Sequence, residues 1–412
     1  MLIEVIKDLI AREILDSRGN PTVEVDLILD NNKTYRASVP SGASAGSREA
    51  LELRDKDERY HGKGVRRAVN NVNNIIKPAI IGKKADVVVI DRIMQKIDGT
   101  TNKSTLGANA TLAVSLATLK AACDLEGKEL WEYLSTSKVS LPIPMMNVIN
   151  GGAHADSGLA IQEFMIVPVV PTFKERLRVG SEVFHTLKDI LKKDGYHVAV
   201  GDEGGFAPSL RSTEDALVYI VKAINESGYV PGKDVFIALD VAASEIYNEN
   251  TNTYRIDNRV LSARDLLKFY SYIVDKYPII SIEDPFDEND FESFQLITKL
   301  LGNKIMLVGD DYFVTNSRCL QKGIDMGAGN AIIIKANQIG TVSETIETLI
   351  LAKKNKYVPI ISHRSGETED TFISDFAVGL SIPYIKTGSL SRGERIAKYN
   401  QLLRIEEKLL RK

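Results

Sequence analysis

The sequence predicts an α/β protein in which a small α+β domain precedes a barrel of alternating strands and helices. The N-terminal third contains a strand hairpin followed by helical patterns. Beyond Pro142 and Pro144, apolar strands alternate with helices, and six strands lead into chargeable residues. These strand ends follow one another at intervals of 23 to 43 residues, the length of a strand–helix unit. We therefore place an N-terminal α+β domain at residues 1–135 and the barrel at residues 136–412.

The N-terminal domain begins with a strand hairpin. Residues 22–29 alternate apolar and polar side chains, residues 30–33 resemble a turn, and residues 34–39 form the second strand. Residues 41–46 contain only small side chains, which makes this loop flexible by composition. Helical periodicity then dominates three segments, residues 65–76, 87–97 and 109–125. Strands followed by helices are typical of an α+β domain.

Three helices of the second domain carry a start signal. A hydroxyl-bearing residue stands three positions before an acidic one, and such a pair satisfies the free amides of a first helical turn. The pairs are Ser212 with Asp215, Ser262 with Asp265, and Thr341 with Glu344. Helices therefore separate the strands, as a barrel of strand–helix units requires.

The strand ends of the second domain carry most of its candidate chemistry. Val/Ile/Leu-rich runs such as residues 331–334 indicate strands buried on both faces, which is typical of a parallel sheet. The charged residues at these ends are Asp240, Glu283, Asp310, Lys335, His363 and Lys386. A doubly wound open sheet is the alternative. A barrel better explains functional groups on six consecutive strands, because its strands end at one rim.

The acidic strand ends predict a magnesium site. Asp240, Glu283 and Asp310 offer carboxylate oxygens, which Mg²⁺ prefers together with water and substrate oxygens. Any one of these acids alone could cap a helix or pair with a lysine, but three on adjacent strands favour the metal. Lys335 beside such a metal should have a lowered pKa and act as a general base. Lys386 adds a second ammonium group, which indicates a substrate with several negative charges.

Two further motifs suggest an anion site and an acid. Arg364 and Ser365 could cradle a phosphate, although Arg364 could instead pair with Glu367 or Glu369. Glu203 stands among glycines and is either a general acid or a turn residue.

Several other chemistries are not supported. None of the five histidines lies in an H-E-x-x-H arrangement, which argues against a zinc peptidase and leaves His154 ambiguous. We find no Walker loop, no G-x-G-x-x-G fingerprint and no nucleophile elbow. A nucleotide-dependent kinase, a dehydrogenase and a serine hydrolase are therefore disfavoured.

Composition points to an ordinary protein of the cytoplasm. The 412 residues carry a net charge of −3 with both signs interspersed, so nucleic acid and anionic membranes are poor candidate partners. Cys123 and Cys319 suggest a reducing compartment. The first 18 residues contain too many charges for a signal peptide, and no apolar stretch is long enough to span a bilayer. We therefore expect a cytoplasmic protein without a transmembrane segment.

Long runs of the chain resemble the enolase family, the phosphopyruvate hydratases of glycolysis. The runs are residues 16–24, 49–55, 162–165, 201–208, 281–286, 335–341, 362–370 and 398–406. They cover the chain from end to end, and chance matches to all of them are negligible. The resemblance implies reversible dehydration of 2-phospho-D-glycerate to phosphoenolpyruvate, a step of glycolysis and gluconeogenesis. It also implies that Lys335 removes the C2 proton, Glu203 protonates the departing C3 hydroxyl, and Lys386 stabilises the charged intermediate.

The resemblance implies ligands for metal and substrate as well. Two Mg²⁺ ions would bind per active site, a structural ion and a catalytic ion that arrives with substrate. Their protein ligands would be Asp240, Glu283 and Asp310 for the first ion and Ser44 for the second. Residues lining the substrate pocket would be His154, Gln162, Glu163, His363, Arg364, Ser365 and Lys386.

The implied fold is an α+β cap on an eight-stranded TIM-like barrel whose first strands are antiparallel. Family members are commonly homodimers and sometimes octamers. This chain departs from the family pattern at Ala45, where we expect Thr, and at Ser157, where we expect Asn. Two alternatives stay open: another enzyme of the same superfamily, and a non-enzymatic receptor, scaffold or structural role. Retention of the ligands and of the base favours catalysis.

Overall fold

The chain begins with a three-stranded antiparallel sheet in this computed structural model, which describes residues 4–43, 46–136, 138–155 and 157–411. The strands lie in the order β1 (Ile6–Leu15), β2 (Pro21–Leu29) and β3 (Thr34–Ser38). The predicted hairpin is confirmed as β2 and β3. We did not predict β1, because charged residues interrupt its apolar alternation.

Helix α4 (Ala108–Leu125) packs against β2 and β3 and is buried along most of its length. The other helical segments of this domain are η1 (Arg59–Gly62), α1 (Arg66–Asn71), η2 (Val72–Ile76), α2 (Lys77–Ile80), α3 (Val87–Asp98) and α5 (Leu130–Leu134). All three predicted helical segments are confirmed. The first of them comprises α1 and η2, a π-helical stretch that continues into α2.

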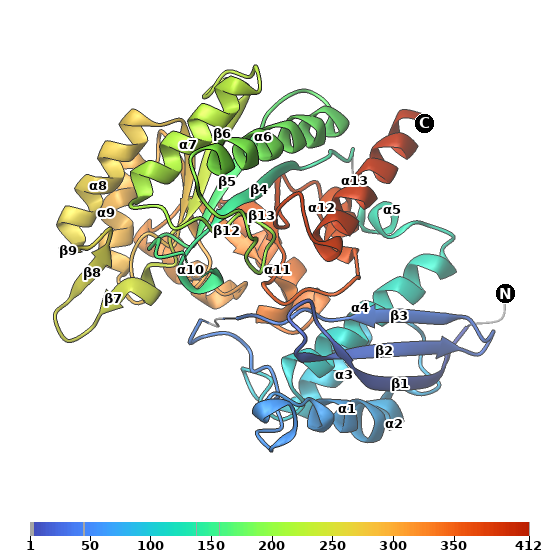
Figure 1. Ribbon diagram of the computed structural model, residues 1–412. Helices are drawn as coiled ribbons and strands as arrows, with labels where there is room; N and C mark the ends of the chain where they lie inside the picture. Colours follow the sequence, from blue (N-terminus) through green and yellow to red (C-terminus); the bar gives the residue numbers. More distant parts are fainter. Residues whose placement is uncertain (1–3, 44–45, 137, 156, 412) are drawn as a thin grey trace.

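Eight strands close into a barrel above this domain (Figure 1). Around the barrel they are β10 (Ile279–Glu283), β11 (Met306–Gly309), β12 (Ala331–Ile334), β13 (Val358–Ser362), β14 (Tyr384–Lys386), β4 (Ile143–Asn150), β5 (Glu163–Pro168) and β6 (Val235–Asp240). Strand β5 is antiparallel to both β4 and β6, and the other neighbours are parallel. The predicted α+β cap and eight-stranded barrel are confirmed, and the open sheet is excluded.

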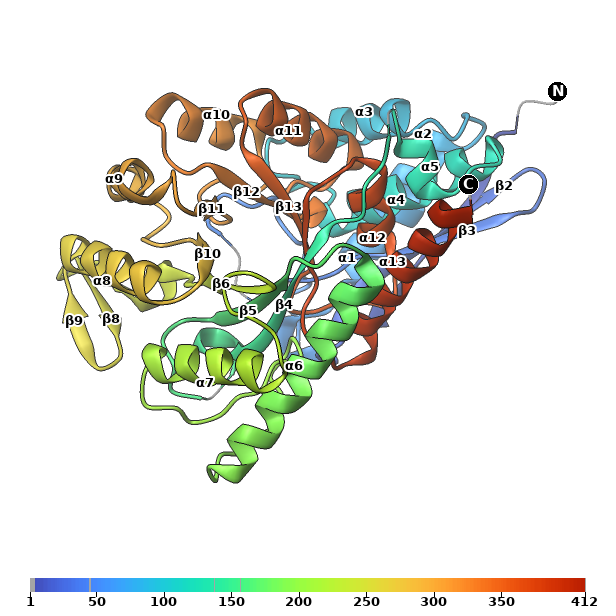
Figure 2. The same ribbon diagram turned by 90° about the horizontal axis from the view of Figure 1, so that it is seen from above.

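Helices surround the barrel strands (Figure 2). They are α6 (Phe173–Lys193), α7 (Thr213–Glu226), α8 (Ala263–Lys276), α9 (Phe291–Leu301), α10 (Ser317–Met326), α11 (Val342–Lys354), α12 (Phe372–Gly379) and α13 (Gly393–Arg411). The predicted caps are confirmed at α7, α8 and α11, where Ser212, Ser262 and Thr341 accept hydrogen bonds from the amides three residues later.

Shorter elements fill the connections: η3 (Gly152–His154), η4 (Ala243–Ile246), η5 (Ala336–Gln338), and a small sheet of β7 (Tyr247–Asn248), β8 (Thr253–Ile256) and β9 (Arg259–Leu261). The boundary that we place at residues 135/136 falls between α5 and β4 and stays a proposal. Within the described ranges, no helix combines the length and apolarity needed to cross a membrane.

The interior of the barrel is apolar below the rim. It is filled by Met145, Met165, Val167, Ala238, Val308, Ala331, Ile333 and Ile360. Polar residues follow where the strands end, so the packed interior supports a polar rim. The N-terminal domain reaches this rim: Ser41 forms a backbone bridge with Gly366, and the Ala50 amide donates a 2.8 Å hydrogen bond to the Gln338 carbonyl.

Candidate active site

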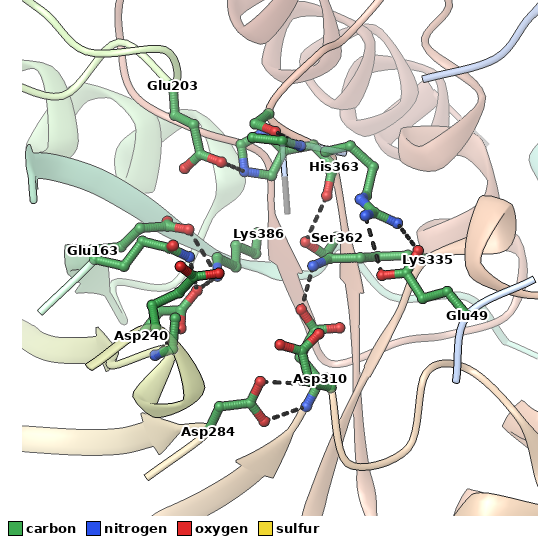
Figure 3. Close-up of a pocket in the computed structure, with 17 residues that line it drawn as sticks. Glu49, Glu163, Glu203, Asp240, Asp284, Asp310, Lys335, Ser362, His363 and Lys386 are labelled. Atoms are coloured by element: carbon green, nitrogen blue, oxygen red, sulfur yellow. Dashed lines mark hydrogen bonds and ion pairs between the residues drawn. The ribbon is translucent and has the colours of Figure 1, made fainter. Parts of the chain in front are cut away.

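A polar pocket lies at the rim of the barrel, closed on one side by the N-terminal domain (Figure 3). Predicted site residues that line it are Gln162, Glu163, Glu203, Asp240, Asp310, Lys335, His363, Arg364, Ser365 and Lys386. Residues without a predicted role complete the lining: Ala43, Glu49, Ala242, Glu245, Asp284, Asp311 and Ser362. Closure of the barrel therefore brings most of the predicted residues together.

The remaining three predicted residues have different positions. Glu283 is buried beside Lys386, behind the lining of the pocket. Ser44 lies outside the described residues. His154 ends η3, and its side chain is not among the described parts of the chain.

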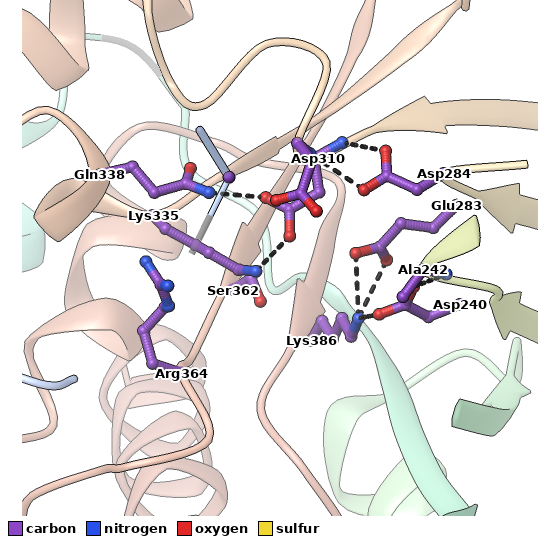
Figure 4. A network of polar contacts seen from close by, with 12 residues as sticks. Asp240, Ala242, Glu283, Asp284, Asp310, Lys335, Gln338, Ser362, Arg364 and Lys386 are labelled. Atoms are coloured by element: carbon purple, nitrogen blue, oxygen red, sulfur yellow. Dashed lines mark hydrogen bonds and ion pairs between the residues drawn. The ribbon is translucent and has the colours of Figure 1, made fainter. Parts of the chain in front are cut away.

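The Lys386 ammonium lies within a buried cluster of carboxylates (Figure 4). Its Nζ is 2.8 Å from Asp240 Oδ2, 3.0 Å from Glu163 Oε1 and 3.0 Å from Glu283 Oε2. Burial would lower the pKa of Lys386, but the charges of these carboxylates raise it well above its ordinary value. Burial, followed by the charge of Asp240, raises the pKa of Glu283. Lys386 is therefore a stable cation that compensates buried negative charge.

Lys335 supplies the second ammonium group of the pocket. Its Nζ makes an ion pair with Asp310 Oδ2, while Asp310 Oδ1 accepts a 2.8 Å hydrogen bond from Gln338 Nε2. Burial would lower the pKa of Lys335, but the charges of Asp310 and Glu283 act in the opposite direction, and the net shift is upward. The predicted lowering refers to Lys335 beside a metal ion and stays a prediction; in the structure, the direct partner of the ammonium group is Asp310.

Asp284 organises the segment that follows β11. Its Oδ1 accepts a hydrogen bond of 2.8 Å from the Asp310 amide, and its Oδ2 accepts one of 2.9 Å from the Asp311 amide. Burial, followed by the charges of Asp311 and Asp310, raises the pKa of Asp284 well above its ordinary value. Burial and the charge of Asp310 raise the pKa of Asp311 to about 8. This corner of the pocket thus brings together three acids, and their burial and mutual repulsion favour protonation of Asp284 and Asp311.

The composition of the pocket fits a hard divalent cation. Its lining contains eight acidic side chains against the cations Lys335, Arg364 and Lys386, and carboxylate oxygens are ligands that Mg²⁺ prefers. In the described residues, two triplets have ligand atoms within 4.8 Å of one another: Glu163, Glu203 and His363, and Asp284, Asp310 and Asp311. The predicted trio Asp240, Glu283 and Asp310 is not such a triplet. In Figure 4, Lys386 contacts the first two acids and Lys335 contacts the third.

Glu203 enters the pocket from the loop between α6 and α7. Asn147 Nδ2 donates hydrogen bonds of 3.1 Å to Glu203 Oε2 and to Glu163 Oε2. His363 Nε2 lies 3.6 Å from Glu203 Oε1. Burial lowers the pKa of His363 well below its ordinary value, even though the charge of Glu203 opposes this shift. The imidazole is therefore neutral at physiological pH.

Arg364 and Ser365 both contact the N-terminal domain. The Arg364 guanidinium makes a bidentate ion pair with Glu49, with Nη1–Oε2 and Nη2–Oε1 distances of 2.9 and 3.1 Å. The Ala43 amide donates a 2.7 Å hydrogen bond to Ser365 Oγ. Glu367 instead accepts from the Arg364 backbone amide, so the alternative ion pair from Arg364 to Glu367 is not the one that forms.

Several pocket residues had no predicted role. Asp284 and Asp311 directly follow the predicted ligands Glu283 and Asp310. Two adjacent acids at the end of a strand could therefore have indicated these two pocket residues from the sequence. Glu49 and Asn147 carry no comparable pattern. Both are placed by contacts between segments that are distant in the chain.

Comparison with known families covers nearly the whole chain. Residues 6–134 match the family model described as the enolase N-terminal domain. Residues 138–412 match the family model described as the enolase C-terminal TIM barrel domain. The two matches meet between α5 and β4, where the α+β unit gives way to the barrel.

Proposed function

The chain belongs to the enolase family, and we propose that it catalyses the reversible, Mg²⁺-dependent dehydration of 2-phospho-D-glycerate to phosphoenolpyruvate. One observation carries the proposal. Lys335 and Glu203, a base and an acid, enter the same pocket from opposite sides (Figure 3), and Arg364 and Ser365 line this pocket too. Removal of a proton and loss of a hydroxyl from adjacent carbons need such a pair.

The reaction divides between these two side chains. Lys335 Nζ takes the C2 proton, and the electron pair left on C2 spreads onto the neighbouring carboxylate. This pair then forms the C2=C3 bond as the C3–O bond breaks. The hydroxyl takes a proton from the Glu203 carboxyl and leaves as water. Lys386, a stable cation in the carboxylate cluster, would stabilise the negative charge that accumulates on the substrate.

The substrate phosphate would bind Arg364 and Ser365, since a guanidinium and a hydroxyl are suitable donors for phosphate oxygens. Gln162, Glu163, His154 and His363 would line the pocket around it. Because Glu49 now occupies one edge of the Arg364 guanidinium, phosphate binding competes with this ion pair or uses the other edge.

The carboxylate-rich lining suits the implied metal ions. Asp240, Glu283 and Asp310 would hold the structural Mg²⁺, and Ser44 would contribute to a second, catalytic site. When bound, Mg²⁺ would neutralise these acids, lower the pKa of Lys335 and stabilise charge on the substrate carboxylate.

The test is formation of the enol product from 2-phospho-D-glycerate, followed by ultraviolet absorbance. Activity should require Mg²⁺ and disappear with EDTA. Lys335→Ala should lose at least about 1000-fold in kcat while keeping its circular dichroism spectrum. Lys304→Ala, which removes an exposed lysine of the same domain, is the control and should be fully active. Undiminished turnover in Lys335→Ala would remove Lys335 as the base.

Assembly and location remain predictions. We expect a homodimer, with an octamer as the alternative, in the cytoplasm. Sedimentation velocity distinguishes monomer, dimer and octamer directly.

A further inference from the structure

A fully buried guanidinium contacts two loops of the pocket, the loop that carries Glu203 and the loop that carries Arg364 and Ser365. Arg395, in the first turn of α13, has no exposed surface. Its Nη1 donates to the Arg364 carbonyl at 2.6 Å, and its Nη2 donates to the carbonyls of Ser365 at 2.7 Å and Asp202 at 3.1 Å. Asp202 directly precedes Glu203, so one side chain connects both loops and cannot rotate away without losing several hydrogen bonds.

The same guanidinium contacts the imidazole of His363. Arg395 Nη1 lies 2.5 Å from His363 Nδ1. A guanidinium has donors and no acceptor, so His363 Nδ1 must accept this hydrogen bond. In a neutral imidazole with an accepting Nδ1, the proton lies on Nε2. Arg395 thereby sets the tautomer of His363.

This tautomer directs an N–H group toward Glu203. His363 Nε2 is buried, lies 3.6 Å from Glu203 Oε1 and has no hydrogen-bond partner in the described part of the chain. With the opposite tautomer, Nε2 would present a lone pair and could take the proton that Glu203 must deliver to the substrate. With the N–H, the imidazole cannot act as a base and can donate to the Glu203 carboxylate once its proton has left.

We propose that Arg395 is a positioning residue for the dehydration: it holds His363 in the Nε2–H tautomer so that Glu203 keeps its proton for the substrate. The catalytic part rests on the proposed function, because it requires Glu203 to be the general acid. The tautomer itself follows from the contacts of Arg395 alone. The neutral state of His363 supports the argument, since burial lowers its pKa and the charges of Arg395, Lys386 and Lys335 act in the same direction.

The first experiment measures the tautomer in the wild-type protein. The protein is labelled with ¹⁵N-histidine, and the His363 signals among the five histidines are assigned by their loss in His363→Phe. We expect Nδ1 to resonate as an unprotonated nitrogen and Nε2 as a protonated one at neutral pH. A protonated Nδ1 overturns the proposal. This measurement requires neither catalytic activity nor an Arg395 variant that folds.

The second experiment asks whether Arg395 acts through His363. Arg395→Met should lower kcat by about 100-fold in the wild-type background, a typical loss when general acid catalysis is impaired. In the His363→Phe background the same substitution should lower kcat by less than about tenfold, because the imidazole is absent and only the contacts of Arg395 with backbone carbonyls are lost. An equal loss in both backgrounds overturns the proposal.

Lys398→Met is the matched control for burial. Lys398 is also a fully buried cation of α13, and its Nζ contacts Glu367 Oε2 at 2.9 Å and the Thr368 carbonyl at 2.6 Å. This variant should keep kcat within about threefold of wild type. A loss as large as that of Arg395→Met shows that the effect is structural and rejects a positioning role.

The proposal and the proposed function fail in different ways. If wild-type protein does not dehydrate 2-phospho-D-glycerate, the proposed function fails and the catalytic role of Arg395 fails with it. If wild type is active and Nδ1 is protonated, only the inference about Arg395 fails.

Discussion

Replacement of Lys386 by Met should destabilise the protein strongly, because it leaves three buried carboxylates without their shared cation. The Lys386 side chain is 2% exposed, and its Nζ lies within 3.0 Å of Glu163, Asp240 and Glu283. At an effective dielectric constant of about 20, each contact is worth roughly 5 kcal/mol before desolvation. Desolvation offsets much of this attraction, and removal of one partner from a buried ion pair typically costs about 3–5 kcal/mol.

This cost can be measured by calorimetric unfolding in EDTA at neutral pH. For a large domain, about 2 °C is lost per kcal/mol, so Lys386→Met should unfold about 6–10 °C below wild type. Lys335→Met is the matched control, because its ammonium pairs with one carboxylate among the residues that the structure describes and its side chain is 14% exposed. The unfolding temperature of this control should fall distinctly less than that of Lys386→Met. An equal or larger loss in Lys335→Met would refute the idea that the carboxylate cluster depends on Lys386.

Two further predictions concern other parts of the chain. Glu49→Gln removes the charge paired with Arg364, so inorganic phosphate should bind about tenfold more tightly in calorimetric titration; unchanged or weaker binding would contradict competition at this guanidinium. Buried Asp91, which accepts two hydrogen bonds from Ser343, has a pKa raised by burial to about 6. A carboxyl pKa raised from 3.8 to about 6 adds stability at low pH, on the order of 3 kcal/mol, that is lost as pH rises from about 4 to about 6. Between about pH 4 and about pH 7, the unfolding temperature of Asp91→Asn should therefore fall less than that of wild type; equal falls would contradict this.

Local features of the fold could be predicted because they depend on residues a few positions apart. Ser212, Ser262 and Thr341 each cap a helix through an amide three residues later, and all three caps are present. Strand β1 was not predicted, because it depends on its partner strand and not on its own residues. Its side chains alternate poorly, and its pairing with β2 makes it a strand.

The position of the site could also be predicted, since strands of a closed barrel end at one rim. Which charged side chains of the site form ion pairs with one another could not be predicted. Arg364 was expected to bind phosphate or a neighbouring glutamate, and it pairs with Glu49, 315 residues away in the chain. Lys335 was expected to lie beside a metal ion, and its direct partner in the structure is Asp310, whose charge raises its pKa.

The residue types at the strand ends and the starts of the helices can be read from the amino-acid sequence, because both follow from periodicity and from hydrogen bonds between near neighbours. The position of Lys386 among three carboxylates and the contact of Arg395 with His363 depend on the folded chain. These contacts join segments far apart in the chain, and their distances exist only once the sheet closes and α13 packs beneath the pocket.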